Sequence, residues 1–272
     1  MNQKTLVLAV ETSSRIGSVA IALGEKILAE TAFSAPIRHS AEIFPAISNI
    51  LDRFSRKLDQ IDQVHISVGP GSFTGLRIAV TLAKTMHLAN AAKIIAVDTL
   101  DVIAANATDY IKEQNTTITF HSERSKVEDP LSLSSTPIGE RQSPERIATI
   151  TDAKRGQFFT AVYQRDTSDE QPATSYGIWE KIFPDSLMTA SQFLDQLARD
   201  EKPICLLGDG LLYYKDKFKA DTVRFLDEKY WSPRASKVHL LGWKKTLNNQ
   251  FADPLTLTPN YLLRPDIKIK PR

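Results

Sequence analysis

The chain is poor in the residues that mark disulfide-rich, strongly charged or membrane-spanning proteins. It has one cysteine, Cys205, which excludes an internal disulfide framework, and its apolar neighbours predict a buried thiol. The 34 basic and 32 acidic residues leave a formal net charge of +2, which gives no reason to expect direct nucleic-acid binding outside a local basic patch. No apolar run approaches the roughly 20 residues of a membrane span, so a cytoplasmic location is the default expectation.

Several catalytic signatures are also missing. No two of the five histidines are three or four residues apart and none is paired with a cysteine, which excludes a helical zinc site. The sequence contains no G-x-S-x-G turn, no P-loop lysine and no dinucleotide-binding G-x-G-x-x-G. A peptidase function therefore has neither a nucleophile nor a metal pair to support it. We expect His65, on the non-core face of its strand, to be structural, and His39, at a helix start, to serve packing or a partner contact.

What is present is an ordinary globular composition with a repeated pattern of strands and helices. Hydrophobic residues make up 42% of the chain and charged residues 24%, and the length allows one large domain or two of usual size. The first apolar run is short and ends in Glu11, which predicts a strand rather than a signal peptide. We predict strands at 5–10, 17–23, 27–33, 64–68 and 94–97 and helices at 40–54, 73–92 and 100–107.

The same order of elements returns in the second half. We predict strands at 147–152, 158–163, 177–182 and 203–207, and helices at 189–199, 210–218 and 235–248. In each half the first strand ends in an acidic residue followed by small or polar residues and a glycine, at Glu11 and at Asp152. Two β-β-β-α-β-α units with such turns are the plan of the actin-like and Hsp70-like ATPase (ASKHA) fold, so we predict an α/β protein of that class.

A polar segment separates the halves. Residues 108–146 contain three prolines and a serine-rich patch, and a segment of this composition cannot bury much apolar surface. We predict an N-terminal lobe over 1–107, a mobile linker over 108–146 that proteolysis cuts first, and a C-terminal lobe over 147–272. A short strand at 117–120 is expected within the linker. We expect the last helix and the basic tail to pack back on the first lobe.

The most specific motif is the string GPGSFTGLR, which joins the strand at 64–68 to the helix at 73–92. A strand that ends in a glycine-rich turn and opens into a helix aims several backbone N–H groups at one point, where they either cradle a phosphate or carboxylate or permit close backbone packing. We expect the serine of this turn to cap the helix. The motif turn consists of Gly69, Gly71, Ser72, Gly75 and Arg77.

This string, together with LAVETSSRIGSVAIA near the start of the chain and RHSAEIFP at 38–45, resembles the bacterial TsaB (YeaZ) proteins, partners in making threonylcarbamoyladenosine in tRNA. The resemblance is dense over residues 5–107. It is thinner through ITDAKRGQFFTAVY at 150–163 and LLGDG at 206–210. The long segment at 108–146 departs from the family, whose members cross there with a short connection.

Residues at the two acidic turns form a candidate nucleotide site. In the actin-like ATPases, hydroxyl and glycine residues at such turns contact phosphate, and an acid faces the cleft through metal-bound water. The alternative is that Glu11 and Asp152 satisfy turn amides and that Asp209 lies near a helix N-cap. We expect no required cofactor, and weak binding of ATP or ADP stays an open alternative. The candidate residues are Glu11, Ser13, Ser14, Asp152, Gly208, Asp209 and Gly210.

Two helices carry more apolar surface than one sheet contact needs. The helix at 73–92 has apolar stripes on two sides, and the helix at 40–54 offers apolar residues nearby. Either the chain's own last helix or another chain covers this surface. In TsaB-like proteins the two helices pack against the equivalent pair of TsaD, so the resemblance implies a partner interface, and Leu82→Glu is expected to abolish association while sparing the fold. The interface residues are His39, Phe44, Ile47, Leu51, Ile78, Leu82 and Met86.

The resemblance therefore implies a scaffold with no catalytic or metal-binding residue of its own, which binds and activates a TsaD-like threonylcarbamoyltransferase, with a TsaE-like ATPase also joining. It further implies a heterodimer with that partner, a homodimer when the chain is alone, no membrane contact, and at most indirect contact with tRNA. The rival function is an active ATP-dependent phosphotransferase of the same fold, with Glu11 and Asp152 as the acids of a metal cleft.

Overall fold

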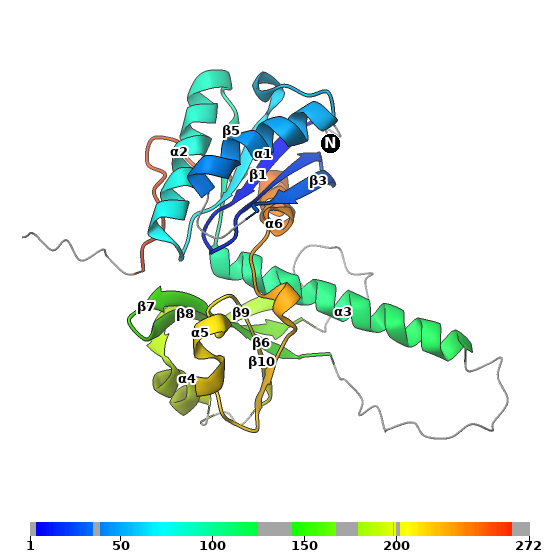
Figure 1. Cartoon of the computed structure of the whole chain (residues 1–272), viewed down its shortest axis with the longest axis vertical. Coiled ribbons are helices and arrows are strands. Elements are labelled where there is room, and N and C mark those ends of the chain that lie inside the picture. Colours follow the sequence, from blue (N-terminus) through cyan, green and yellow to red (C-terminus); the bar gives the residue numbers. More distant parts are fainter. Residues whose placement is uncertain are drawn as a thin grey trace, which may run out of the picture.

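The computed structural model describes residues 4–34, 39–124, 143–166, 179–197, 199 and 202–262. They form two α/β lobes, which lie one above the other in Figure 1. The lobes are joined by the long helix α3 (Thr99–Arg124) and by the segment that leads from the second lobe into α6 (Ala235–Leu247). Each lobe has its own sheet and its own main cluster of buried apolar side chains.

The first sheet has the strand order β3-β2-β1-β4-β5. Its strands are β1 (Leu6–Glu11), β2 (Ser18–Leu23), β3 (Lys26–Ala32), β4 (Gln63–Ser67) and β5 (Lys93–Val97). The first three are antiparallel neighbours, whereas β4 runs parallel to β1 and β5 parallel to β4. The central strand β1 reads LVLAVE and is buried along its whole length, as expected of a strand that is covered on both faces.

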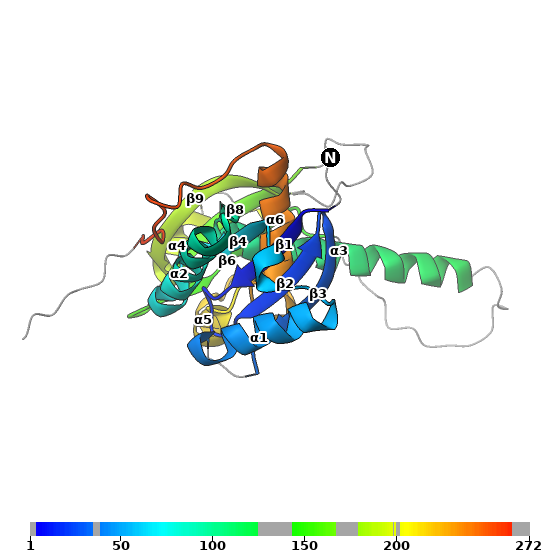
Figure 2. The ribbon, with the colours of Figure 1, turned by 90° about the horizontal axis from the view of Figure 1, so that it is seen from above.

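Helices cover both faces of this sheet. α1 (His39–Arg53) and α2 (Phe73–Asn90) pack on one face, and α6 packs on the other, where Ala235 and Val238 meet apolar side chains of β1, β2 and β5 (Figure 2). The expectation that His65 lies on a non-core face is therefore wrong, because α6 buries it completely. A Cβ on Gly242 would lie 2.4 Å from the His65 ring, so the glycine lets α6 approach β4 closely.

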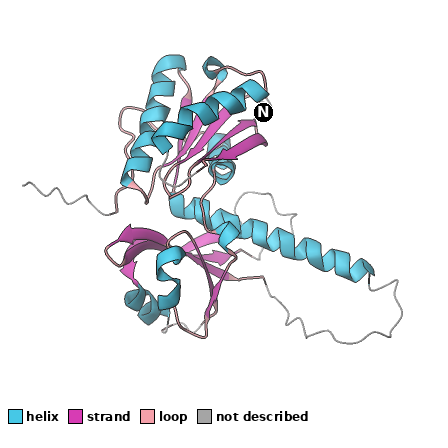
Figure 3. Ribbon diagram, in the orientation of Figure 1, coloured by secondary structure: helices cyan, strands magenta, loops and turns pink. Residues whose placement is uncertain are grey.

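The second sheet repeats this order with one strand bent in two. Its strands are β6 (Arg146–Thr149), β7 (Thr151–Lys154), β8 (Gln157–Arg165), β9 (Trp179–Thr189), β10 (Ile204–Leu207) and β11 (Val223–Phe225). β6 and β7 both pair antiparallel with β8, β8 pairs antiparallel with β9, and β10 and β11 continue the sheet parallel to β6 (Figure 3). With β6 and β7 counted as one bent strand, both lobes have the order 3-2-1-4-5 and the same pairings. The repeat confirms the actin-like fold.

The remaining described elements are short. They are α4 (Ala190–Leu197), α5 (Leu211–Tyr214) and 3-10 turns at Leu58–Gln60, Lys215–Lys217 and Glu228–Tyr230. The helix expected at 210–218 is thus one short α-helix followed by a 3-10 turn. The strand expected at 177–182 runs on to Thr189, and β11 was not predicted, because three residues are too few to show a period.

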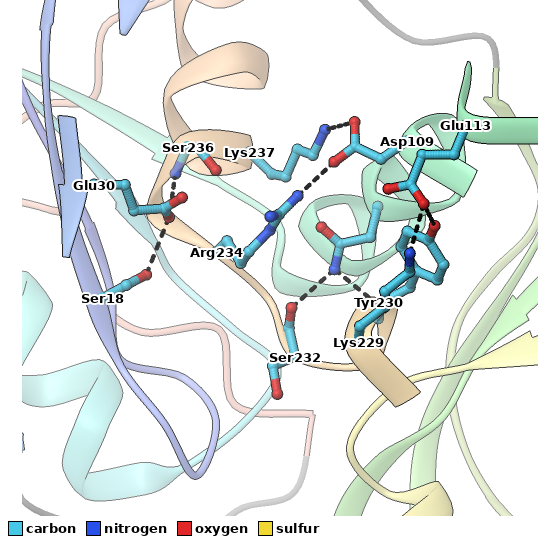
Figure 4. Close-up of polar contacts among 11 residues, drawn as sticks. Ser18, Glu30, Asp109, Glu113, Lys229, Tyr230, Ser232, Arg234, Ser236 and Lys237 are labelled. Carbon is cyan, nitrogen blue, oxygen red and sulfur yellow. Dashed lines mark hydrogen bonds and ion pairs between the residues drawn. The ribbon is translucent and has the colours of Figure 1, made fainter. Parts of the chain in front are cut away.

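The predicted linker is wrong over its first half. α3 continues to Arg124, so residues 108–124 are helical and the strand expected at 117–120 does not form. The physical reason lies in the acids of this stretch. Asp109 accepts charge-assisted hydrogen bonds from Arg234 and Lys237, at the start of α6, and Glu113 accepts one from Lys229 (Figure 4). These ion pairs hold polar residues in place where burial of apolar side chains cannot. The rest of the predicted linker, up to residue 142, lies outside the described residues.

Candidate functional site

The motif turn packs the start of α2 onto the turn that follows β1. Ser72 is the N-cap of α2 as expected, and its hydroxyl accepts a hydrogen bond from the Gly75 N–H at 3.3 Å. A Cβ on Gly75 would lie 1.7 Å from the Thr12 carbonyl oxygen, a distance that only glycine avoids. The Ser72 N–H donates to the Ser13 carbonyl oxygen at 2.7 Å, and the Thr12 hydroxyl donates to the Gly75 carbonyl oxygen at 2.7 Å. Of the two roles left open for the turn, the geometry matches close backbone packing.

Glu11 is fully buried beneath this turn. One of its carboxylate oxygens accepts hydrogen bonds from the N–H and the hydroxyl of Ser13, both at 2.5 Å, and the other accepts from the Ser67 hydroxyl. Burial raises the pKa of Glu11, and the hydrogen bonds from the two serines partly offset that rise. Glu11 therefore satisfies donors inside the first lobe and does not line the cleft between the lobes.

Asp152 occupies the corresponding turn of the second lobe, and it does face the cleft. Its Oδ1 atom accepts hydrogen bonds from the Lys154 N–H and the Tyr214 hydroxyl, both at 2.9 Å, and its Oδ2 atom lies 2.5 Å from the Lys154 Nζ atom. Burial opposes ionisation, but the hydrogen bonds from Lys154 and Tyr214 outweigh it and lower the pKa of Asp152. The two acidic turns, alike in sequence, thus hold their carboxylates in different surroundings.

Asp209 is a cleft acid with an unused oxygen. It lies in the turn between β10 and α5, which the Gly210 N–H fastens to the Ile150 carbonyl oxygen at 2.9 Å. It lies near the N-cap as the alternative expected, directly before the N-cap residue Gly210, but no side chain makes a capping hydrogen bond to α5. Burial raises the pKa of Asp209 to about 6, against a hydrogen bond from the Arg15 backbone N–H of the first lobe, which lowers it. Its Oδ1 atom has no hydrogen-bond partner among the described residues.

The cleft between the lobes has a volume of about 500 Å³ and is lined by both lobes and by residues 260–262. Arg15 from the first lobe and Lys154 from the second lie over the Tyr213 ring, at 5.7 and 5.5 Å from its centre. Neither cation was singled out from the sequence. Of the candidate nucleotide residues, the cleft lining includes Ser13, Ser14, Asp152 and Asp209 and leaves out Glu11, Gly208 and Gly210.

The hydroxyl groups near the cleft are mostly engaged within their own turns. Ser13 donates to Glu11, and Ser14 donates to the Ile16 carbonyl oxygen at 3.4 Å. In the part of the chain that the structure describes, no three His, Cys, Asp or Glu side chains come together as a metal site. None of the described helices is long and apolar enough to cross a membrane. The arrangement holds backbone turns together and leaves few donors free for a phosphate.

His39 fastens the start of α1 to the same region. Its Nε2 atom lies 2.9 Å from the Ser14 carbonyl oxygen, and its ring centre lies 5.6 Å from that of Phe33. Burial lowers the pKa of His39, which favours the neutral ring. The residue is 5% exposed, so its contacts match local packing, one of the two roles left open, and not a surface contact with a partner.

A groove of about 380 Å³ runs between α1 and α2. Phe44, at its edge, is 63% exposed, and Ile78 is half-buried. The other apolar residues expected at a partner surface are core residues of the first lobe, because the stripe that carries them faces the sheet; these are Ile47, Leu51, Leu82 and Met86. The expectation that they form an exposed face is wrong, and this removes the reason for expecting Leu82→Glu to spare the fold. Leu82 is 6% exposed.

The last described residues return to the motif turn as a C-terminal strap, residues 257–262. The Asn260 N–H donates to the Val68 carbonyl oxygen at 2.6 Å. The Tyr261 ring packs at 5.1 Å from the Phe73 ring, and its hydroxyl accepts from the Arg77 Nε atom at 3.2 Å. The Arg77 guanidinium in turn lies 3.8 Å from the Phe73 ring centre. The tail was expected to pack back on the first lobe, and the strap does so up to residue 262, but Asn260 and Tyr261 were not singled out from the sequence as its contacts.

Comparison with known proteins agrees with the resemblance. Residues 27–118 match the family model described as TsaD, tRNA N6-adenosine threonylcarbamoyltransferase. The chain is 26% identical over 259 residues to the tRNA threonylcarbamoyladenosine biosynthesis protein TsaB of Bacillus subtilis, an alignment that covers 94% of this chain and 93% of that protein. TsaB of Escherichia coli is 22% identical over 259 residues, with 93% and 95% covered.

Solved structures show the same fold. YeaZ from Pseudomonas aeruginosa superposes on this chain with a TM-score of 0.69 and 20% identity, covering 95% of this chain and 100% of that one. At this identity the likeness concerns the fold alone. The TsaB relatives come from several species, and those of Bacillus subtilis and Escherichia coli align over nearly their whole length. The motif string, the two-lobe fold and these relatives together place the chain in the TsaB (YeaZ) family.

Proposed function

We propose that this chain is a non-catalytic subunit of the machinery that makes threonylcarbamoyladenosine in tRNA, and that it binds and activates a TsaD-like transferase. The relatives named for that pathway support its place there. The observation that supports a non-catalytic role is that the hydrogen-bond donors of the two turns already have partners within the protein. The Thr12 hydroxyl and the Ser72 N–H donate to carbonyl oxygens of the facing turn, and the Gly75 N–H donates to the Ser72 hydroxyl. The N–H and hydroxyl of Ser13 donate to Glu11, so these donors are used within the turns instead of being left for a phosphate.

The rival function, an ATP-dependent phosphotransferase, was expected to use Glu11 and Asp152 as the acids that face one cleft. Asp152 faces the cleft, but Glu11 is fully buried in the first lobe, and this difference favours the scaffold. We expect the purified chain to show no ATP turnover, whether or not ATP or ADP binds weakly in the cleft. Turnover that is lost in Asp152→Asn but retained in Glu113→Gln, a surface change away from the cleft, would establish the rival.

The partner surface that we propose is the groove between α1 and α2. Phe44 stands exposed at its edge, and Phe73 and Ile78 contribute apolar walls. An exposed aromatic side chain beside an apolar hollow is the usual anatomy of an interface hot spot. A TsaE-like ATPase joins the resulting heterodimer. When the partner is absent, the same groove pairs with a second copy of this chain.

Phe44→Asp tests this surface. We expect it to weaken binding to the cognate TsaD-like transferase by at least about 30-fold, or roughly 2 kcal/mol, because it removes an anchor and adds a charge. Formation of threonylcarbamoyladenosine in a reconstituted reaction should fall with binding, while the melting temperature stays unchanged because Phe44 is exposed.

Leu88→Asp is the matched control for this experiment. Leu88 is 84% exposed on α2 but does not line the groove, so its replacement should leave binding intact. Leu82→Glu, in contrast, should lower the melting temperature, because Leu82 belongs to the core. An equal loss of binding in Phe44→Asp and Leu88→Asp, or a loss in neither, contradicts the proposed surface.

A further inference from the structure

Two polar atoms in the lining of the cleft are buried without a hydrogen-bond partner. They are the Oδ1 atom of Asp209 and the Oγ1 atom of Thr151, and neither has a partner among the described residues. Asp209 is 6% exposed and Thr151 is 3% exposed. Because a buried polar atom without a partner costs free energy, two of them in the lining of one hollow indicate a ligand that supplies the missing hydrogen bonds.

The two side chains come from neighbouring segments of the second lobe. The Gly210 N–H donates to the Ile150 carbonyl oxygen at 2.9 Å, so the turn at 208–210 lies directly against the segment 150–152. That segment includes the start of β7, which lies on the side of the second lobe nearest the first (Figure 1). The two unpartnered atoms therefore belong to the same wall of the cleft.

This wall needs a group that donates hydrogen bonds. A carboxylate oxygen only accepts, and a hydroxyl group accepts as well as donates. The turn donors that a phosphate would use are already bonded within the first lobe. A primary ammonium group has three N–H donors and a positive charge, and it forms strong, charge-assisted hydrogen bonds with a carboxylate. An ammonium group thus fits the wall better than an anion does.

The opposite wall offers a cation. The Arg15 guanidinium lies 5.7 Å from the centre of the Tyr213 ring and makes no ion pair with a described residue, whereas Lys154 is paired with Asp152 at 2.5 Å. The Arg15 N–H is bonded to Asp209, so the long side chain of Arg15 can reach a ligand held there. A guanidinium binds a carboxylate through two parallel hydrogen bonds. The two cations and two acids of the lining balance, and a ligand with one charge of each sign keeps that balance.

We propose that the cleft binds an α-amino acid, with its ammonium group at Asp209 and Thr151 and its carboxylate at Arg15. The hollow of about 500 Å³ leaves room for the side chain of the ligand. Both acceptor atoms are buried, so the turn that carries Arg15 must move to admit the ligand. The site is a property of the isolated chain and goes beyond the scaffold function proposed above.

Calorimetric titration of the isolated chain with the common L-amino acids, one at a time, tests the site. We expect at least one of them to bind in the millimolar range or more tightly. Two analogues of that amino acid are then titrated, the acid that lacks the amino group and the amine that lacks the carboxyl group. Each should bind at least about tenfold more weakly, because each loses one of the two charged contacts.

Two hydroxyl groups provide a matched pair of variants. Thr151→Val removes the unpartnered hydroxyl of the cleft, and Thr160→Val removes one that is also buried and unpartnered but does not line the cleft. Neither should lower the melting temperature, because each removes an unsatisfied polar group. Thr151→Val alone should weaken binding of the amino acid, by about fivefold.

The charged contacts should have larger effects. Asp209→Asn keeps the shape of the side chain and removes its charge, and Arg15→Gln removes the guanidinium. Each should weaken binding of the amino acid by about tenfold or more. The matched controls are Glu113→Gln and Arg53→Gln, at residues that do not line the cleft, and they should bind the amino acid as the parent does.

Four outcomes overturn the site. The first is that no amino acid binds. The second is that the acid without an amino group binds as tightly as the amino acid, which would leave an anion site. The third is an equal loss of binding in Thr151→Val and Thr160→Val, which would assign the loss to the fold. The fourth is binding of ADP or ATP, lost in Asp209→Asn, while amino acids do not bind.

Binding of the TsaD-like transferase is measured separately. A chain that binds an amino acid but no transferase supports the site and contradicts the scaffold. A chain that binds the transferase but no amino acid contradicts the site and leaves the scaffold standing.

Discussion

Two of the contacts between the lobes are built in opposite ways. Beside α3, the segment at 229–237 is held by side chains of α3 through ion pairs and hydrogen bonds (Figure 4). At the cleft, the Arg15 backbone N–H of one lobe donates a hydrogen bond to Asp209 of the other. The two residues line a hollow of about 500 Å³. The same two lobes are therefore fastened on one side and open on the other.

On the fastened side, Asn106 and Asp109 of α3 contact the segment at 230–237. Asp109 accepts from Arg234 at 2.5 Å and from Lys237 at 2.6 Å, and the Lys237 side chain is only 10% exposed. The Asn106 side chain donates to the carbonyl oxygens of Tyr230 and Ser232 at 3.0 and 2.8 Å. A buried cation that loses its partner is costly, so this joint holds the lobes without any ligand between them. Such a joint is consistent with the proposed scaffold, because the relative position of the lobes is fixed before any partner binds.

The largest effect is expected from Gly75→Ala, which disrupts the floor of the cleft and leaves the α3 joint intact. Replacing glycine by alanine inside a helix normally stabilises it, but here the new Cβ would lie 1.7 Å from the Thr12 carbonyl oxygen. We expect a loss of about 3 kcal/mol or more and a melting temperature lower by roughly 10 °C. The neighbouring Thr74→Ala, at an exposed position, is the control. A melting temperature near that of the parent would mean that α2 shifts to make room.

Asp109→Ala tests the fastened side directly. It leaves Lys237 buried without its carboxylate, and we expect a loss of about 2–3 kcal/mol in thermal or denaturant unfolding. The double variant Asp109→Ala with Lys237→Met should recover much of this loss, because an apolar pair avoids the unpaired charge. If the double variant is no more stable than Asp109→Ala, the joint depends on packing and not on charge.

On the open side, we expect Asp209 to make the unfolding free energy depend on pH. Burial raises the pKa of Asp209 from an ordinary 3.8 to about 6, so the folded state favours the protonated carboxyl group. The stability that this group contributes is fully present below pH 4 and is lost as pH rises from about 4 to 6, by an amount of order 2–3 kcal/mol. Asp209→Asn should remove this dependence. The unfolding free energy of the variant should therefore rise relative to that of the parent as pH increases from about 4 to 6. If the unfolding free energies of the two proteins change with pH in parallel, the raised pKa of Asp209 is contradicted.

The smallest effect is expected from Glu113→Ala, on the same joint as Asp109. Its ion pair with Lys229 at 2.5 Å is more than half exposed on both sides, so water and salt screen it. We expect the melting temperature to change by at most about 2 °C, and less as salt is added. A fall as large as that of Asp109→Ala would mean that the whole α3 joint acts as one network.

Local patterns predicted the first lobe well. Period-two and period-3.6 repeats of apolar residues lie within one element, so they predict the five strands and the helices α1 and α2 to within a few residues. The Ser72 cap was predicted for the same reason, since it depends on residues three apart. The partner surface was harder. α2 carries two apolar stripes, and the choice of stripe that faces the sheet depends on the rotation of the helix, which its own residues do not encode.

The sequence by itself determined the order of the elements, the repeated plan of the two lobes and the family, because these follow from local periodicity and from one specific string. Tertiary structure alone decided where the polar residues find their partners. Glu11 meets Ser67, Asp109 meets Arg234, and Asn260 meets Val68, and each pair is more than 50 residues apart in the chain. A charged or polar residue has the same appearance in a sequence whether it faces water or a distant partner. Only folding brings the two groups together, and this is how a segment that resembled a linker became the helix that joins the lobes.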